Sequence, residues 1–269
     1  HDSTDADAAV SGGILKVGNL DVVSASRDKI LNIGVGGAGS MYAGVAGSVG
    51  VNIIDGSSKA QIMDDADITS ANNVVVNAQS DAAIDNLSGI LAGAVTGGSI
   101  GLSVSVNDIE ETTLAGVSGK DTKITAKGTT DEKVADKLAS GLTGGYMNTS
   151  ISVVPASYMD RADSEYRGIA VSSSNTDKIQ VWALNAAVTG LGGAVNGNIN
   201  VSTIGGSTTA SVAGASFNAG SGDINVVAHD YANNAAFVGL FGLVVGGGSA
   251  GVGSDTLTIN RNTDASLSG

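Results

Sequence analysis

The chain repeats itself at a spacing of about 55 residues. One signature occurs four times: an aliphatic residue, Ala six positions later, and a second aliphatic residue two positions beyond that. The four copies are Ile54, Ala60, Ile62; Ile109, Ala115, Val117; Ile204, Ala210, Val212; and Ile259, Ala265, Leu267. The outer pairs of copies lie 55 residues apart and the middle pair 95. A repeat of this length restricts the fold to a solenoid, a propeller or an array of small domains.

A second marker divides the chain more finely. It is a short β-rich run that ends in Ala, and it occurs at Ala25, Ala78, Ala126, Ala183 and Ala228. With the first signature it predicts that residues 1–269 form a single elongated domain of about five degenerate repeats of ~45–57 residues. The third repeat, about residues 121–175, is the divergent one.

Each repeat contains a Gly-rich tract that leads into a strictly alternating run. Val49, Val51 and Ile53, for example, alternate with Ser48, Gly50 and Asn52. A period of two residues is typical of a β-strand with one apolar face and one polar face. The sequence therefore predicts strands in every repeat.

Composition selects among the three repeat architectures. A propeller would show aromatic signatures in each blade, and the chain has only one Trp, five Tyr and three Phe. Linkers between small domains would be richer in proline than a chain whose one proline is Pro155. The remaining fold is all-β, a parallel β-helix (β-solenoid). We expect two or three coils per repeat, a core of Val, Ile, Leu and Ala, and ten to thirteen coils stacked into a rod about 50–60 Å long.

The divergent repeat departs from strand patterning. Thr129 and Glu132 have the spacing of a capping box, Val134 and Leu138 share a helical face, and Gly141 can end a helix. These signals predict a short helix near residues 130–140. A dense charged and aromatic cluster follows, and it supplies the candidate binding residues Tyr158, Asp160, Arg161, Asp163, Glu165, Tyr166 and Arg167.

Charge and cysteine content exclude several function classes. The formal net charge of −13 argues against a nucleic-acid partner. The absence of cysteine excludes disulfides and thiolate zinc sites, and it is typical of exported proteins. Four stretches without charge (residues 30–54, 86–107, 179–222 and 231–254) are long enough for membrane helices, but their alternation and their Gly, Ser and Asn favour strands. We therefore expect no membrane insertion by this segment.

Motifs for chemistry are weak. The G-x-G-x-x-G spacing at Gly34–Gly39 precedes a strand-like run instead of a helix, and His229 and Asp230 point to opposite faces if they lie on a strand. The acids of the run from Asp64 to Asp67 do not match a calcium loop. We predict no catalytic residue, no metal site and no cofactor. Asp160 and Asp163, with Arg161 and Arg167 nearby, leave open a polysaccharide-cleaving β-helix enzyme as an alternative.

The run "SGDINVVAHD" (Ser221–Asp230), its Gly/Ala tract and the alternating strand that follows resemble the degenerate repeats of large Gram-negative filamentous adhesins of the leukotoxin and haemagglutinin-like type. The resemblance covers residues 18–267 except the divergent repeat. It implies that the fold is a right-handed parallel β-helix. It also implies a virulence-associated protein, secreted or on the cell outer surface, that is much longer than this segment. The implied partner is a protein or glycan on host cells or other bacteria. A leukotoxin-type cytotoxin fragment and an inert spacer remain alternatives.

Overall fold

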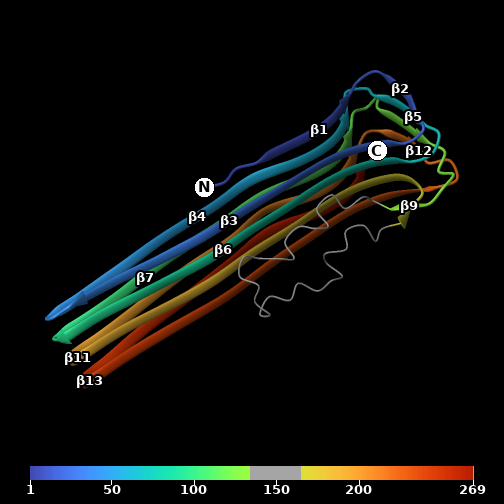
Figure 1. The fold of residues 1–269 in the computed structure, drawn as a ribbon. Helices are drawn as coiled ribbons and strands as arrows, with labels where there is room; N and C mark the ends of the chain where they lie inside the picture. Colours follow the sequence, from blue (N-terminus) through green and yellow to red (C-terminus); the bar gives the residue numbers. More distant parts are fainter. Residues whose placement is uncertain (134–164, 269) are drawn as a thin grey trace.

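The computed structural model describes residues 1–133 and 165–268, and every regular element in these ranges is a β-strand (Figure 1). The strands are β1 (Asp5–Ser11), β2 (Ile14–Val17), β3 (Leu20–Ser40), β4 (Ala43–Met63), β5 (Asp67–Ser70), β6 (Val74–Thr96), β7 (Gly98–Ser118), β8 (Lys123–Ala126), β9 (Glu132–Lys133), β10 (Glu165–Tyr166), β11 (Gly168–Ala213), β12 (Ser216–Asn218) and β13 (Asp223–Ser268).

Each winding of the chain consists of two long strand segments and a short one. In the first complete winding, β3 runs to a turn at residues 41–42, β4 returns, and β5 leads to the next winding. β6, β7 and β8 repeat this path, whereas β11 and β13 each form both long segments as one strand of 46 residues. Successive windings pair in parallel, in the orders β3-β6-β11-β13 and β4-β7-β11-β13, and the short strands form a separate sheet, β2-β5-β8-β12. The prediction of an all-β parallel β-helix is confirmed.

The repeat signature marks positions that are neighbours in adjacent windings. Ile54 pairs with Ile109, which pairs with Ile204, and Ile204 in turn pairs with Ile259. The Ala and second aliphatic positions align in the same way, and β1 adds a partial copy in which Ala8 lies beside Ala60. Identical spacing therefore indicates columns of side chains stacked one above another.

The expected size of a coil is wrong. One repeat makes one winding, because alternation continues through 21 residues in both β3 and β4 without the turn that shorter coils require. At about 3.3 Å per residue, such a strand is roughly 70 Å long, whereas each winding adds only about 4.8 Å along the stacking direction. The long dimension of the molecule therefore lies along its strands (Figure 1).

The divergent repeat does not form a winding between its neighbours. Val74 at the start of β6 pairs with Ile169 of β11, so residues 74–118 and 168–213 belong to adjacent windings. Three of the Ala markers also prove out of register. Ala25 pairs with Gln79, one residue beyond Ala78, Ala126 ends the short strand β8, and Ala183 pairs with Ser88. Of the segment expected to be helical, Glu132 and Lys133 form β9, and residues 134–140 lie outside the described residues.

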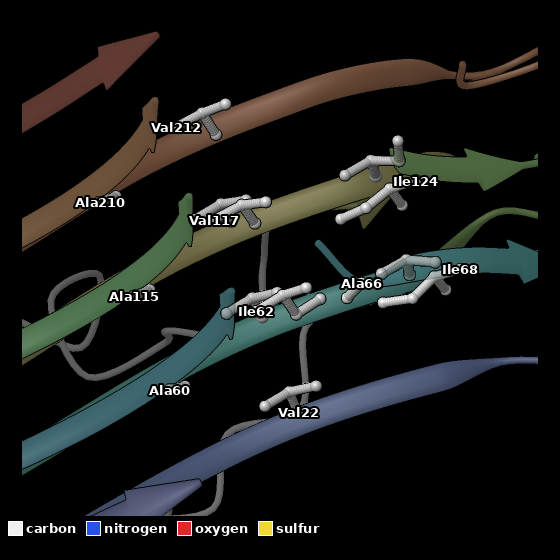
Figure 2. Close-up of a cluster of buried hydrophobic side chains, with 14 of the residues drawn as sticks. Val22, Ala60, Ile62, Ala66, Ile68, Ala115, Val117, Ile124, Ala210 and Val212 are labelled. Carbon is white, nitrogen blue, oxygen red and sulfur yellow. The ribbon is translucent and has the colours of Figure 1, made fainter. Parts of the chain in front are cut away.

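Apolar side chains fill the interior at the end that carries the short strands. Figure 2 shows Ile62, Val117 and Val212 on neighbouring long strands, with Ile68 of β5 and Ile124 of β8 packed beside them. A second cluster farther along the strands contains Ile54, Ile84, Ile109, Ile179 and Ile204. Nearest the turns the buried cluster consists of Ile90 and four alanines. The apolar core thus becomes thinner toward the turns.

The expectation of an interior built throughout from Val, Ile, Leu and Ala is wrong for the half of each winding nearest the turns. In β4, Val49 and Val51 point outward and are 77% and 57% exposed, while Ala46 and Asn52 are buried. Buried asparagines bond from winding to winding: Asn52 Nδ2 donates to Asn107 Oδ1 at 2.8 Å, and Asn107 Nδ2 donates to Asn200 Oδ1 at 3.0 Å. Small side chains fit this narrow interior, and its bonded asparagines satisfy one another there.

Candidate functional site

The two ends of the divergent segment lie side by side. β9 and β10 are antiparallel, with Lys133 opposite Glu165 and Glu132 opposite Tyr166. The chain therefore leaves the windings after β8 and returns to them before β11 at the same place. Departures from a repeat consensus map to surface loops in solenoids, and this departure lies between two paired windings.

Two asparagines between β5 and β6 hold both ends of the segment. The buried Asn73 donates from Nδ2 to the Thr130 carbonyl oxygen at 2.9 Å, and its Oδ1 accepts from the Gly168 N–H at 2.8 Å. Asn72 Oδ1 accepts from the N–H groups of Thr129 and Thr130, both at 3.0 Å. One turn thus fixes the exit and the return of the chain.

Three of the seven predicted binding residues fall among the described residues, and two of these three make structural contacts. Tyr166 is 4% exposed, packs against Val75 and Ala170, and donates from its hydroxyl to Glu132 Oε2 at 3.3 Å. Burial raises the pKa of the Tyr166 hydroxyl. Glu165 is exposed. Tyr158, Asp160, Arg161 and Asp163 lie outside the described residues.

Arg167 forms a two-point ion pair with Asp131 across the base of the segment. Arg167 Nε lies 2.7 Å from Asp131 Oδ1, and Nη2 lies 2.8 Å from Oδ2. These hydrogen bonds lower the pKa of the Asp131 carboxyl and raise that of the Arg167 guanidinium. Thr129 and Glu132, the residues of the expected capping box, both bond to the side chain of Asn72 instead.

Sequence analysis missed an interior carboxylate cluster, which comprises Asp28, Glu111, Asp177 and Asp230 with Arg261. Arg261 Nε lies 3.0 Å from Asp230 Oδ2, and its Nη1 lies 2.5 Å from Asp177 Oδ2. The guanidinium also donates to the Gly205 carbonyl oxygen and to Thr208 Oγ1. Burial raises the pKa of Asp177, and the charge of Arg261 opposes that shift.

Glu111 and Asp28 form the other half of the cluster, without a cation between them. Glu111 Oε2 accepts from Ser80 Oγ at 2.7 Å, and Asp28 Oδ1 accepts from the Thr4 hydroxyl. Glu111 Oε1 and Asp28 Oδ2 have no hydrogen-bond partner among the described residues. Burial raises the pKa of Asp28 and raises the pKa of Glu111 to about 7. Within residues 1–133 and 165–268, no group of three or more His, Asp or Glu side chains is arranged to hold a metal ion.

The sequence does contain a signal for this cluster. Asp28, Glu111 and Asp177 each stand two residues from an inward-facing isoleucine, and residues two apart on a strand share a face. Asp230 also faces the interior through its bonds to Arg261, while its neighbour His229 is exposed on the opposite face as predicted. Gly34–Gly39 lie within β3, which confirms that they form no dinucleotide-binding turn.

Comparison of the chain with protein-family models, with curated proteins and with solved structures finds no match. The described part of the chain contains no helix long and apolar enough to cross a membrane.

Proposed function

We propose that this chain is a repeat segment of a secreted or surface-exposed bacterial adhesin, serving as a stalk and as a binding surface without a catalytic site. The observation that carries the proposal is the combination of windings stacked in register with a single long departure whose ends are pinned by Asn72 and Asn73. Windings built to a repeat supply a stable scaffold, and a departure anchored at both ends is suited to presenting a variable surface.

The proposed contact residues are those of the divergent segment, and the proposed partner is a protein or glycan on a host cell or another bacterium. Tyr and Arg are favoured in contact surfaces because they combine large area with directional hydrogen bonds. The segment holds Tyr158 and Arg161 within a few residues of Asp160 and Asp163. The net charge of −13 favours partners other than nucleic acids.

The test replaces residues 134–164 with Asn-Gly, so that Lys133 and Glu165 become joined by a two-residue hairpin turn. Because these residues already face each other in an antiparallel pair, the turn closes β9 and β10 without strain. We expect an unchanged strand signal in circular dichroism and at least a tenfold loss of binding to epithelial cells and to arrayed glycans. A full-length variant with Tyr158, Asp160, Arg161 and Asp163 replaced by Ala should lose binding to a similar extent.

The matched control is Glu110→Ala, which makes the same kind of change at an exposed glutamate on β7, outside the segment, and should retain binding. Undiminished cell and glycan binding by the Asn-Gly variant would show that the segment is a tolerated insertion. The adhesion proposal would then fail for this segment.

A further inference from the structure

The outer surface of the solenoid is apolar over the half nearest the turns. We call this region, formed by the outward side chains of residues 31–53, 87–106, 182–201 and 237–254, the turn-end apolar zone. Its exposed members include Ile33, Val49, Leu102, Leu184, Phe241 and Val252. The turn between β3 and β4 adds the exposed Met41 and Tyr42. Isolated exposed apolar side chains are ordinary in proteins, but a continuous surface of them marks a contact region.

The zone carries no charged residue on either face of its strands. Its polar groups are instead turned inward, where Asn52, Asn107 and Asn200 bond to one another and Asn200 Nδ2 donates to Asp255 Oδ1 at 2.5 Å. Apolar groups outside and paired polar groups inside reverse the usual arrangement of a water-exposed sheet. This arrangement is stable where the surroundings are less polar than the interior.

The shape of the zone distinguishes among possible surroundings. Apolar residues cover the outer faces of both long sheets, with Val35 and Leu184 on one and Val49 and Leu102 on the other, and they continue around the turns. A protein partner docked on the outer face of one long sheet would leave the outer face of the other sheet in water. A surrounding apolar solvent would cover the outer faces of both sheets.

The depth of the zone agrees with a lipid bilayer. The outward residues from Val45 to Ile53 span about 26 Å at 3.3 Å per residue, which is close to the thickness of the hydrocarbon core, about 30 Å. Trp182 and Phe237, whose ring centroids are 5.3 Å apart, lie at the margin far from the turns, and Tyr42 lies in a turn. Aromatic residues with polar atoms favour the two interfaces of a bilayer.

We infer that the turn end of the solenoid inserts into the hydrocarbon region of a lipid bilayer, with the short-strand end in water. This departs from the expectation, drawn from the sequence, that the segment does not insert. Insertion requires partners for the backbone groups at both edges of the stack, since among the described residues β13 pairs only with β11 and β3 only with β6. Further copies of the chain, stacked edge to edge in the same parallel register, would satisfy both edges as β13 satisfies the edge of β11.

The protein supplies its own probe, since Trp182 is the only tryptophan of the chain and lies in the zone. With vesicles of neutral phosphatidylcholine, we expect the protein to float with the lipid in a density gradient, and to remain bound in 0.5 M salt. The Trp182 emission should shift to the blue and be quenched by phosphatidylcholine brominated on its acyl chains.

A matched pair of variants locates the contact. Val49→Lys places a charge in the zone and should reduce the fraction bound at least tenfold, because a charge in hydrocarbon is costly. Ile14→Lys is the control: Ile14 is 77% exposed, as Val49 is, but it lies on β2 at the opposite end of the molecule. Circular dichroism should show the same strand signal for both variants.

Three results would overturn the inference. These are no flotation with neutral vesicles, binding only to anionic vesicles at low salt, and self-association in the absence of lipid that Val49→Lys abolishes. The last result would show that a second copy of the chain covers the zone. None of these results decides the adhesion proposal, because the test of that proposal concerns residues 134–164 and not the turn-end apolar zone.

Discussion

Glu111 is buried in a setting that favours its neutral form. Its pKa is about 7, above the ordinary 4.5, chiefly because burial penalises the carboxylate. The folded state therefore binds this proton more tightly than the unfolded state does. The stability that Glu111 contributes is complete below pH 4.5, declines as the pH rises, and is lost above pH 7. The difference between the folded-state pKa and the ordinary pKa corresponds to about 3 kcal/mol of folding free energy.

Glu111→Gln should remove this pH dependence. Glutamine retains an oxygen that accepts from Ser80 and cannot ionise. Between pH 5 and pH 8, the wild-type free energy of unfolding should fall relative to that of the variant by about 3 kcal/mol, measured by urea denaturation. The control is Glu110→Gln, a substitution of the exposed neighbour of Glu111. Its free energy of unfolding should change with pH as that of the wild type does. Parallel curves for wild type and Glu111→Gln would refute the argument.

Gly206 is required by both backbone conformation and space. Its φ is +111°, and a Cβ at this position would lie 1.9 Å from the Glu111 carbonyl oxygen in the adjacent winding. We expect Gly206→Ala to destabilise the fold by at least about 3 kcal/mol. Gly39→Ala, where nothing lies within 4 Å of the added Cβ, should change stability by less than about 0.5 kcal/mol. Thermal denaturation of the two variants tests the contrast, which equal melting temperatures would contradict.

At the scale of the strands, the asparagines of the interior join one winding to the next. Asn107 accepts at Oδ1 from Asn52 and Asn86, at 2.8 Å and 3.1 Å, and donates from Nδ2 to Asn200. Truncation leaves one donor, Asn52 Nδ2, and one acceptor, Asn200 Oδ1, buried without partners, while Asn86 Nδ2 keeps its bond to Ser105 Oγ. We expect Asn107→Ala to lower the free energy of unfolding by about 3 kcal/mol or more, measured in urea.

Asn198 supplies the matched comparison for Asn107. It is equally buried, but its Oδ1 and Nδ2 have no hydrogen-bond partners among the described residues. Asn198→Ala therefore removes unsatisfied polar atoms and should cost less than about 1 kcal/mol or stabilise the fold. If Asn107→Ala and Asn198→Ala lowered the free energy of unfolding equally, the hydrogen bonds between windings would not be what makes Asn107 stabilising.

The sequence predicted which residues stack but not which face of a strand is inside. Ile54, Ile109 and Ile204 were found from spacing alone, because parallel register preserves spacing. Alternation has the same period whichever face is buried. The sequence nevertheless encodes which face is buried. Adjacent Ile53 and Ile54 mark the point in β4 where the apolar residues change from the outer face to the inner face.

The predicted binding cluster shows a similar limit. Its local composition identified the segment as distinct, but the burial of Tyr166 and the anchoring of Gly168 depend on Glu132 and Asn73. Asn73 stands 95 residues before Gly168 in the sequence. Contacts at that separation follow from the stacking of windings and are not visible in a local pattern.

On the scale of the whole molecule, one winding per repeat means that the number of windings sets the thickness of the solenoid and not its length. Stability should then be close to a sum over windings and the interfaces between them. Deletion of a whole winding is therefore a clean perturbation. Residues 168–222 form such a unit, because Gly168 pairs with Asp223 and the offset of 55 holds throughout β11 and β13.

Deletion of residues 168–222 should place β13 directly on β6 and β7. Arg261 would then stand opposite Glu111, where Gly206 now lies and where a Cβ would meet the Glu111 carbonyl oxygen, so the new junction adds a cost of its own. We expect a folded protein with a lower free energy of unfolding and a smaller urea m-value, since less surface is buried. Its maximum dimension in small-angle X-ray scattering should stay within a few ångströms of the wild-type value of about 70 Å. A rod of short coils would instead shorten by about 10–15 Å, the height of two or three coils, so scattering distinguishes the two architectures directly.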